Sequence, residues 1–182
     1  MSELEQYCKQ FEEIQTQAKE VTEGLNIERF NWRPGPGQWS IEECLAHLLS
    51  SGNERLKAIE AGIDAAKARG LTAAGPFRYG PFDTYMMRLM EPPVKRKFSS
   101  PKRFGPLHEQ PLTGVMPSFH HLQSQLMAQA RRAEGLDLKR IKIPTPLAGF
   151  VRMSLGATFA MIAAHERRHL EQARQVKKQL VR

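Results

Sequence analysis

The chain has 182 residues, of which 41% are hydrophobic and 25% charged, which is typical of one domain, 1–182, with a sizeable core. No apolar run approaches the roughly 20 residues that a membrane-spanning helix needs, and the first residues carry acids where a signal peptide carries bases. Two cysteines do not make a disulfide framework. We therefore expect a cytoplasmic protein with reduced thiols and no membrane partner.

The net charge of +8 is unevenly distributed. Residues 1–70 hold 12 acids and 8 bases, whereas residues 71–182 hold 7 acids and 19 bases. A basic half of this kind suits nucleic acid, an anionic substrate or solvent. Bulk charge alone does not decide among these three.

The first two helices have clear start signals. Ser2 and Glu5 fit a capping box, apolar residues follow in steps of three and four, and Gly24 offers a stop, so we expect a helix over residues 3–23. Ser40 and Glu43 form a second capping box, which predicts a helix over 41–69. Trp39 and Cys44 flank this box where a hydrophobic staple packs, and Gly52 and Gly62 are expected to bend or fray the far end of the helix.

The rest of the chain alternates between connections and helices. Residues 71–112 hold seven of the 12 prolines and form a connection too long for a tight turn, in which Asp83 is expected to cap a short helix that ends at Met90. A third helix fits 114–134, a second connection follows, and a last helix fits 153–180. No strand pattern is convincing. The fold class is therefore all-α, a four-helix bundle with a long crossover between its second and third helices.

His165 and His169 are the strongest local signal for chemistry. Residues four apart on a helix share one face, so both imidazoles can reach one metal ion. They interrupt an apolar stripe that faces the core, where histidines without a metal need other partners for their ring nitrogens. Metal binding is favoured, and satisfied core or surface histidines are the alternative.

The stretch 165–169 also matches HExxH, the helix of zinc proteases. A zinc protease needs a third ligand downstream, and only 13 residues follow His169. Glu166 stands beside Arg167 and Arg168, so we expect it to form a surface ion pair. The protease interpretation is rejected.

A third ligand must then come from elsewhere, and His47 is the best candidate because it lies two turns into the second helix. Taken alone, His47 also fits a satisfied core histidine. Cys44 could ligate as well, although the staple role is favoured, and Glu43 is expected to cap. Adjacent histidines point about 100° apart on a helix and cannot share one ion, so His120 and His121 are read as surface or rim residues; nothing singles out His108.

Two segments together resemble the DinB-like superfamily: WSIEECLAHL at 39–48 and HERRHLEQ at 165–172. The similarity is greatest to the branch grouped with metal-dependent hydrolases and bacillithiol transferases. The resemblance implies a bundle of up-down-down-up order, with His47, His165 and His169 as ligands of one divalent ion, which is zinc, nickel or another metal, with zinc and nickel favoured. It also implies a homodimer and, in some members, transfer of a low-molecular-weight thiol.

Three neutral imidazoles leave a coordination position open. A bound zinc ion lowers the pKa of water to about 7, and it also holds a thiol as its thiolate. Gln172, one step along the inward stripe from His169, is a candidate to support the site from outside the ligand set. We therefore expect a metal-dependent enzyme acting on a small molecule, either a hydrolase or a thiol S-transferase.

The alternative function is a non-catalytic metal-binding protein or a DNA-associated stress protein. The DNA-associated alternative is based on a basic stretch with two aromatic residues in the crossover: Arg88, Lys95, Arg96, Lys97, Phe98, Lys102, Arg103 and Phe104. No recognition-helix motif accompanies these residues. A solvated loop is the preferred interpretation, and nucleic acid is not expected as a partner.

Overall fold

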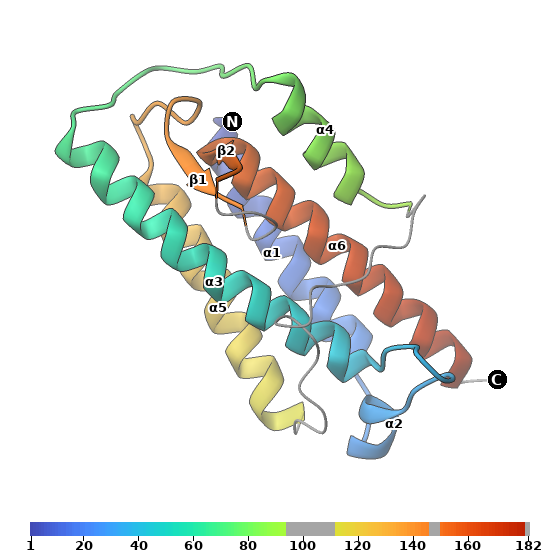
Figure 1. Ribbon diagram of the computed structural model, residues 1–182. Helices are drawn as coiled ribbons and strands as arrows, with labels where there is room; N and C mark the ends of the chain where they lie inside the picture. The colour runs from blue at the N-terminus through green and yellow to red at the C-terminus, as the bar shows by residue number, and fades with distance from the viewer. Residues whose placement is uncertain (94–111, 146–149, 181–182) are drawn as a thin grey trace.

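The computed structural model describes residues 1–93, 112–145 and 150–180 (Figure 1). Its elements in chain order are α1 (Glu3–Thr22), α2 (Ile27–Asn31), α3 (Ile41–Ala68), α4 (Pro81–Met90), α5 (Leu112–Arg132), β1 (Lys142–Pro144), β2 (Arg152–Ser154) and α6 (Leu155–Leu180). The predicted long helices are confirmed to within two residues at each end. The short helix α2 and the two strands were not anticipated.

The long helices form the expected bundle. α1 and α6 run in one direction, and α3 and α5 run in the other, which is the up-down-down-up order (Figure 1). Each of α1 and α3 packs against both α5 and α6. The chain leaves α3 at one end of the bundle and begins α5 at the opposite end, so the connection between them spans its length.

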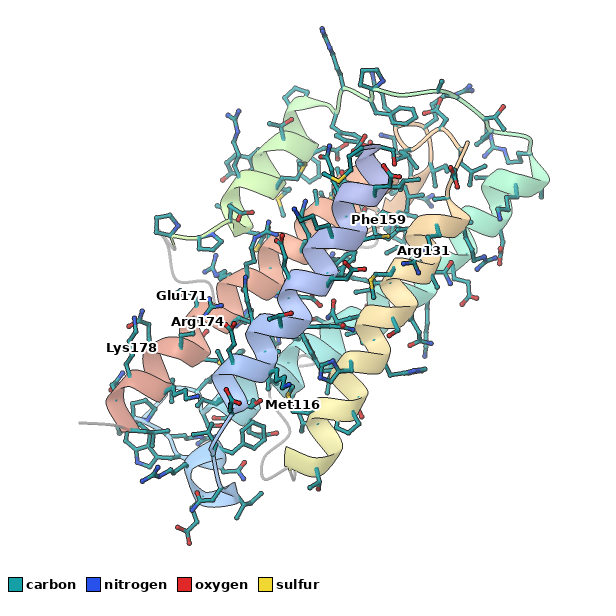
Figure 2. All side chains as sticks on the ribbon, turned by 180° about the vertical axis from the view of Figure 1, so that it is seen from behind. Met116, Arg131, Phe159, Glu171, Arg174 and Lys178 are labelled. Carbon is teal, nitrogen blue, oxygen red and sulfur yellow. The ribbon has the colours of Figure 1, made fainter. Side chains whose placement is uncertain are left out.

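The core follows from the apolar stripes of these helices. On α1 the buried stripe is Tyr7, Phe11, Ile14, Ala18 and Val21. Phe159 of α6 lies against α1, with its ring centroid 5.8 Å from that of Tyr7 and 6.4 Å from that of Phe11 (Figure 2). Across all described residues, no helix is both long and apolar enough to cross a membrane.

The two glycines inside α3 have a packing role. The helix continues without a break through Gly52 and Gly62 to Ala68, so the expected fraying of its far end is wrong. A Cβ atom at Gly52 would come within 2.5 Å of a Leu122 methyl of α5, and one at Gly62 within 2.5 Å of an Ile143 methyl of β1. The missing side chains let these neighbours approach the helix backbone closely, which offsets the propensity cost of glycine.

The short helix α4 is present, but Asp83 does not cap it. Gly80 occupies the N-cap position and makes no side-chain cap bond. Asp83 is instead buried in the first turn, where its Oδ2 accepts a hydrogen bond of 2.6 Å from Ser154 Oγ. This bond fastens α4 to the last residue of β2, directly before α6, and α4 also packs against α6.

The expectation of no strands is wrong. β1 and β2 form a two-stranded antiparallel sheet in which Ile143 lies opposite Met153, and both of these residues are buried. Each strand has three residues, which is too short for an alternating pattern to stand out in the sequence. The sheet leads directly into α6 and thereby sets where that helix begins.

Candidate metal centre

The N-terminus of α3 sets the position of His47. Ser40 and Glu43 form the predicted capping box in both directions, with Glu43 N to Ser40 Oγ at 3.0 Å and Ser40 N to Glu43 Oε2 at 2.9 Å. Arg33 also pairs with the Glu43 carboxylate, through Nε at 2.8 Å and through Nη2. Because the first turn is held from two sides, His47 projects from a well-defined helix, and it is 4% exposed.

Helix α6 brings the other two histidines to His47. Nε2 of His165 lies 3.2 Å from Nε2 of His47. One ligand nitrogen from each of His47, His165 and His169 lies within 4.8 Å of the other two. Two nitrogens bound tetrahedrally to one zinc ion, each at about 2.0–2.1 Å, lie about 3.3 Å apart. The spacing of the His47 and His165 nitrogens therefore fits two ligands of a common ion.

Gln172 fixes the tautomer of His169. Its Oε1 lies 3.2 Å from Nδ1 of His169. Since an amide oxygen is an acceptor only, Nδ1 carries the proton and donates to it. The lone pair of His169 is consequently on Nε2, which is the arrangement that a metal-bound histidine needs.

Trp39 forms one wall of the cluster. Its ring stacks on His169, with a centroid distance of 5.5 Å and an interplanar angle of 18°, and it contacts His47 at 5.1 Å. Sequence reasoning assigned Trp39 to a hydrophobic staple only. Its place directly before the N-cap of the helix that carries His47 is the signal that could have linked it to the site.

Burial keeps His165 and His169 neutral. It lowers the pKa of His169 to about 3, with a further contribution from the nearby His47. The pKa of His165 is also held well below its usual range, first by burial and then by the neighbouring His169 and the positive charge of Arg55. A neutral imidazole is the form that binds a metal. The cluster is thus a set of three imidazole nitrogen donors, two of them held neutral by burial, and this donor set is compatible with a divalent metal ion.

The other candidate residues lie apart from this cluster. Cys44 is fully buried, and burial raises the pKa of its thiol, which opposes the thiolate form that ligates metals. Glu43 caps α3, as described above. His120 and His121 do not belong to the three-histidine group, and His121 is exposed. His108 lies outside the described residues.

Glu166 is not on the surface, so the prediction of a surface ion pair is wrong. It is 1% exposed, and its Oε1 accepts a 2.7 Å hydrogen bond from Gln123 of α5. Arg167 pairs instead with Glu91 at 2.6 Å. Glu166 is next to His165 in the sequence, and one step of a helix turns its side chain toward the α5 side of the bundle.

Two further features lie away from the histidines. A hollow of about 1290 Å³ follows α1, lined by residues that include Tyr7, Cys8, Phe77 and Arg131, and none of the three histidines lines it. Of the basic stretch that motivated a DNA-associated role, Arg88 is exposed on α4. Its remaining residues, Lys95, Arg96, Lys97, Phe98, Lys102, Arg103 and Phe104, lie outside the described residues.

Comparison with known proteins places the chain in a family. The family model described as the DinB superfamily matches residues 10–173, and the chain belongs to that superfamily. It is also similar to the uncharacterized protein YuaE of Bacillus subtilis (strain 168), with 24% identity over 173 residues that cover 94% of this chain and 98% of that protein. No solved structure matches the chain significantly.

Proposed function

We propose that this protein is a metal-dependent enzyme that holds one divalent ion, zinc or nickel, through His47, His165 and His169. The observation that supports this most strongly is the convergence of the three imidazoles from α3 and α6, two of them with Nε2 atoms 3.2 Å apart. A buried group of neutral imidazoles without a ligand is costly, because each ring has one donor and one acceptor to satisfy. A metal ion satisfies all three acceptors at once.

The reaction class follows from the ligand set. A divalent ion bound by three neutral ligands supplies a Lewis acid with an open position, which favours the deprotonated form of a water or of a thiol. The protein holds the imidazoles of His165 and His169 neutral by burial, fixes His169 through Gln172, and covers two rings with Trp39. We infer a hydrolase or a low-molecular-weight thiol S-transferase acting on a small molecule. A homodimer in the cytoplasm is part of the same proposal.

The test compares three preparations loaded with zinc or nickel: wild type, His165→Ala and His121→Ala. The last is a matched control, because His121 is exposed on α5 and lies outside the histidine group. Each is assayed with ester and amide substrates, and separately with small thiols plus an electrophile. We expect activity in wild type and in the control, and a loss of at least 100-fold in His165→Ala. A metal-loaded wild type that is inactive in both assays would favour a non-catalytic metal protein.

A further inference from the structure

Among the Arg and Lys residues of the described chain that are at least half-buried, Arg55 of α3 is the one without a partner. No hydrogen bond or ion pair joins its guanidinium to any described residue, and its Nε is a buried donor without a partner. Every other Arg or Lys that is at least half-buried in the described ranges has a partner. These pairs are Arg132 with Asp64, Arg167 with Glu91, Arg168 with the carbonyl of Leu89, Arg174 with Glu171, and Lys177 with the carbonyls of Glu20 and Glu23.

The position of Arg55 relates it to the histidines. His47, Ser51 and Arg55 follow each other at four-residue intervals and therefore lie along one face of α3. His47 and Ser51 are buried and Arg55 is half-buried. Side chains on a helix lean toward its N-terminus, so a long side chain at position 55 is expected to lean back toward Ser51 and His47.

The surroundings of Arg55 keep it charged and leave its donors free. Burial lowers the guanidinium pKa to about 10, while the charges of Glu54 and Glu166 act to raise it. Glu166 does not form an ion pair with Arg55, because one of its oxygens accepts from Gln123 and the other has no hydrogen-bond partner among the described residues. A half-buried guanidinium whose buried Nε has no partner is costly unless an anion pairs with it.

The proposed metal adds to this local charge. Three neutral imidazoles bring no negative charge to a divalent ion, and Arg55 places a further positive charge on the same side of α3. This excess of positive charge favours a ligand that carries anionic oxygens, and a guanidinium binds such oxygens through two parallel hydrogen bonds.

We propose that Arg55 is the substrate-recognition residue of this site and that the substrate carries a carboxylate or a phosphate, which the guanidinium pairs with while the reactive group lies at the histidines. This inference rests on the proposed function for the position of the reactive group. The recognition of an anion by Arg55 is testable without any turnover.

The test is calorimetric titration of wild type, Arg55→Met and Lys57→Met with acetate and with methyl phosphate, and with neutral acetamide for comparison. Methionine keeps much of the length of the arginine stem and removes its charge. Lys57 is exposed two residues away on the same helix, so its variant removes the same unit charge from the outer face. We expect Arg55→Met to bind at least one of the two anions at least tenfold more weakly than wild type, and Lys57→Met to match wild type. The anion that shows the larger loss identifies the substrate group, and acetamide should show no dependence on Arg55.

Equal anion affinity in wild type and Arg55→Met, or no anion binding in wild type, would overturn the assignment. Thermal unfolding without added anion gives a second readout, in which Arg55→Met should unfold at the same or a higher temperature because an unpartnered, half-buried charge is removed. A clearly lower unfolding temperature would instead make Arg55 a structural residue. Metal content is measured on the same samples. A wild type that takes up no metal contradicts the proposed function, whereas an Arg55-dependent anion affinity in that sample still supports the assignment.

Discussion

The Nε2 atoms of His47 and His165 lie 3.2 Å apart although 118 positions separate the two residues in the chain. Two helices that pack side by side, α3 and α6, bring them together. The capping box at Ser40 sets the start of α3, and the sheet of β1 and β2 sets the start of α6. The local signals at each helix start therefore determine the geometry of a site that lies between the helices.

Replacement of Gln172 tests its support of His169. Gln172→Leu removes the acceptor for Nδ1–H of His169, so the imidazole can rotate and change tautomer. Loss of such a supporting contact typically weakens metal affinity about 10–100-fold. Competition with a chromogenic zinc chelator measures the affinity. Gln179→Leu, at an exposed position on the same helix, is the control and should bind as wild type does; equal affinities in all three proteins would contradict the role.

The metal-free protein should become less stable as the pH is lowered below 6.5. The pKa of His169 is about 3 in the folded chain, against a reference value of 6.5. Above pH 6.5 neither state binds the proton, and the contribution to stability is complete. Below pH 6.5 His169 is protonated in the unfolded chain but not in the folded chain, so the free energy of unfolding decreases as the pH falls.

Urea unfolding with chelator present at pH 7.5, 6.5 and 5.5 measures this slope. His169→Gln should flatten it relative to wild type, and His121→Gln should leave it unchanged. The same slope in His169→Gln as in wild type would show that His169 is not held neutral by the fold.

The close approach of α3 and α5 makes a prediction at Gly52. Gly52→Ala improves helix propensity, but its Cβ would lie within 2.5 Å of the Leu122 methyl. We expect a net destabilisation of about 1–3 kcal/mol, because overpacking outweighs the propensity gain. Urea unfolding of both single variants and of Gly52→Ala with Leu122→Ala forms a double-mutant cycle. Additive effects in that cycle would mean that the two side chains do not compete for space.

The cap at Ser40 should contribute to stability. Ser40→Ala removes the acceptor for the amide of Glu43, and the loss of such a cap costs about 1 kcal/mol. The midpoint of urea unfolding should shift accordingly. Ser50→Ala, on an exposed turn of the same helix, should be neutral or slightly stabilising. Equal midpoints for Ser40→Ala and wild type would show that the cap is dispensable.

The sequence alone predicts the long helices of this fold well, because their signals are local. Capping boxes at Ser2 and Ser40 and apolar steps of three and four residues mark the bounds of α1 and α3 to within one residue of those observed. The three histidines could be singled out for a related reason, since the four-residue spacing of His165 and His169 is itself a local pattern. The order of the helices required the resemblance to a family.

What the sequence could not show depends on contacts between elements. Gly52 looked like a flaw in α3 until the methyl group of Leu122 was seen against it. Glu166 looked like a surface acid beside two arginines, whereas the rotation of α6 turns it toward Gln123. The absence of a partner at Arg55 is likewise a property of the packed bundle, because it depends on what surrounds the guanidinium.

Elemental analysis of the purified protein tests the central claim most directly. Wild type and His121→Ala, loaded with zinc or nickel and freed of excess metal, should each retain one ion per chain. His47→Ala, His165→Ala and His169→Ala should each lose it while their helical content, measured by circular dichroism, stays unchanged. Retention of one ion per chain in all three variants, or no ion in wild type, would contradict a metal centre built from these imidazoles.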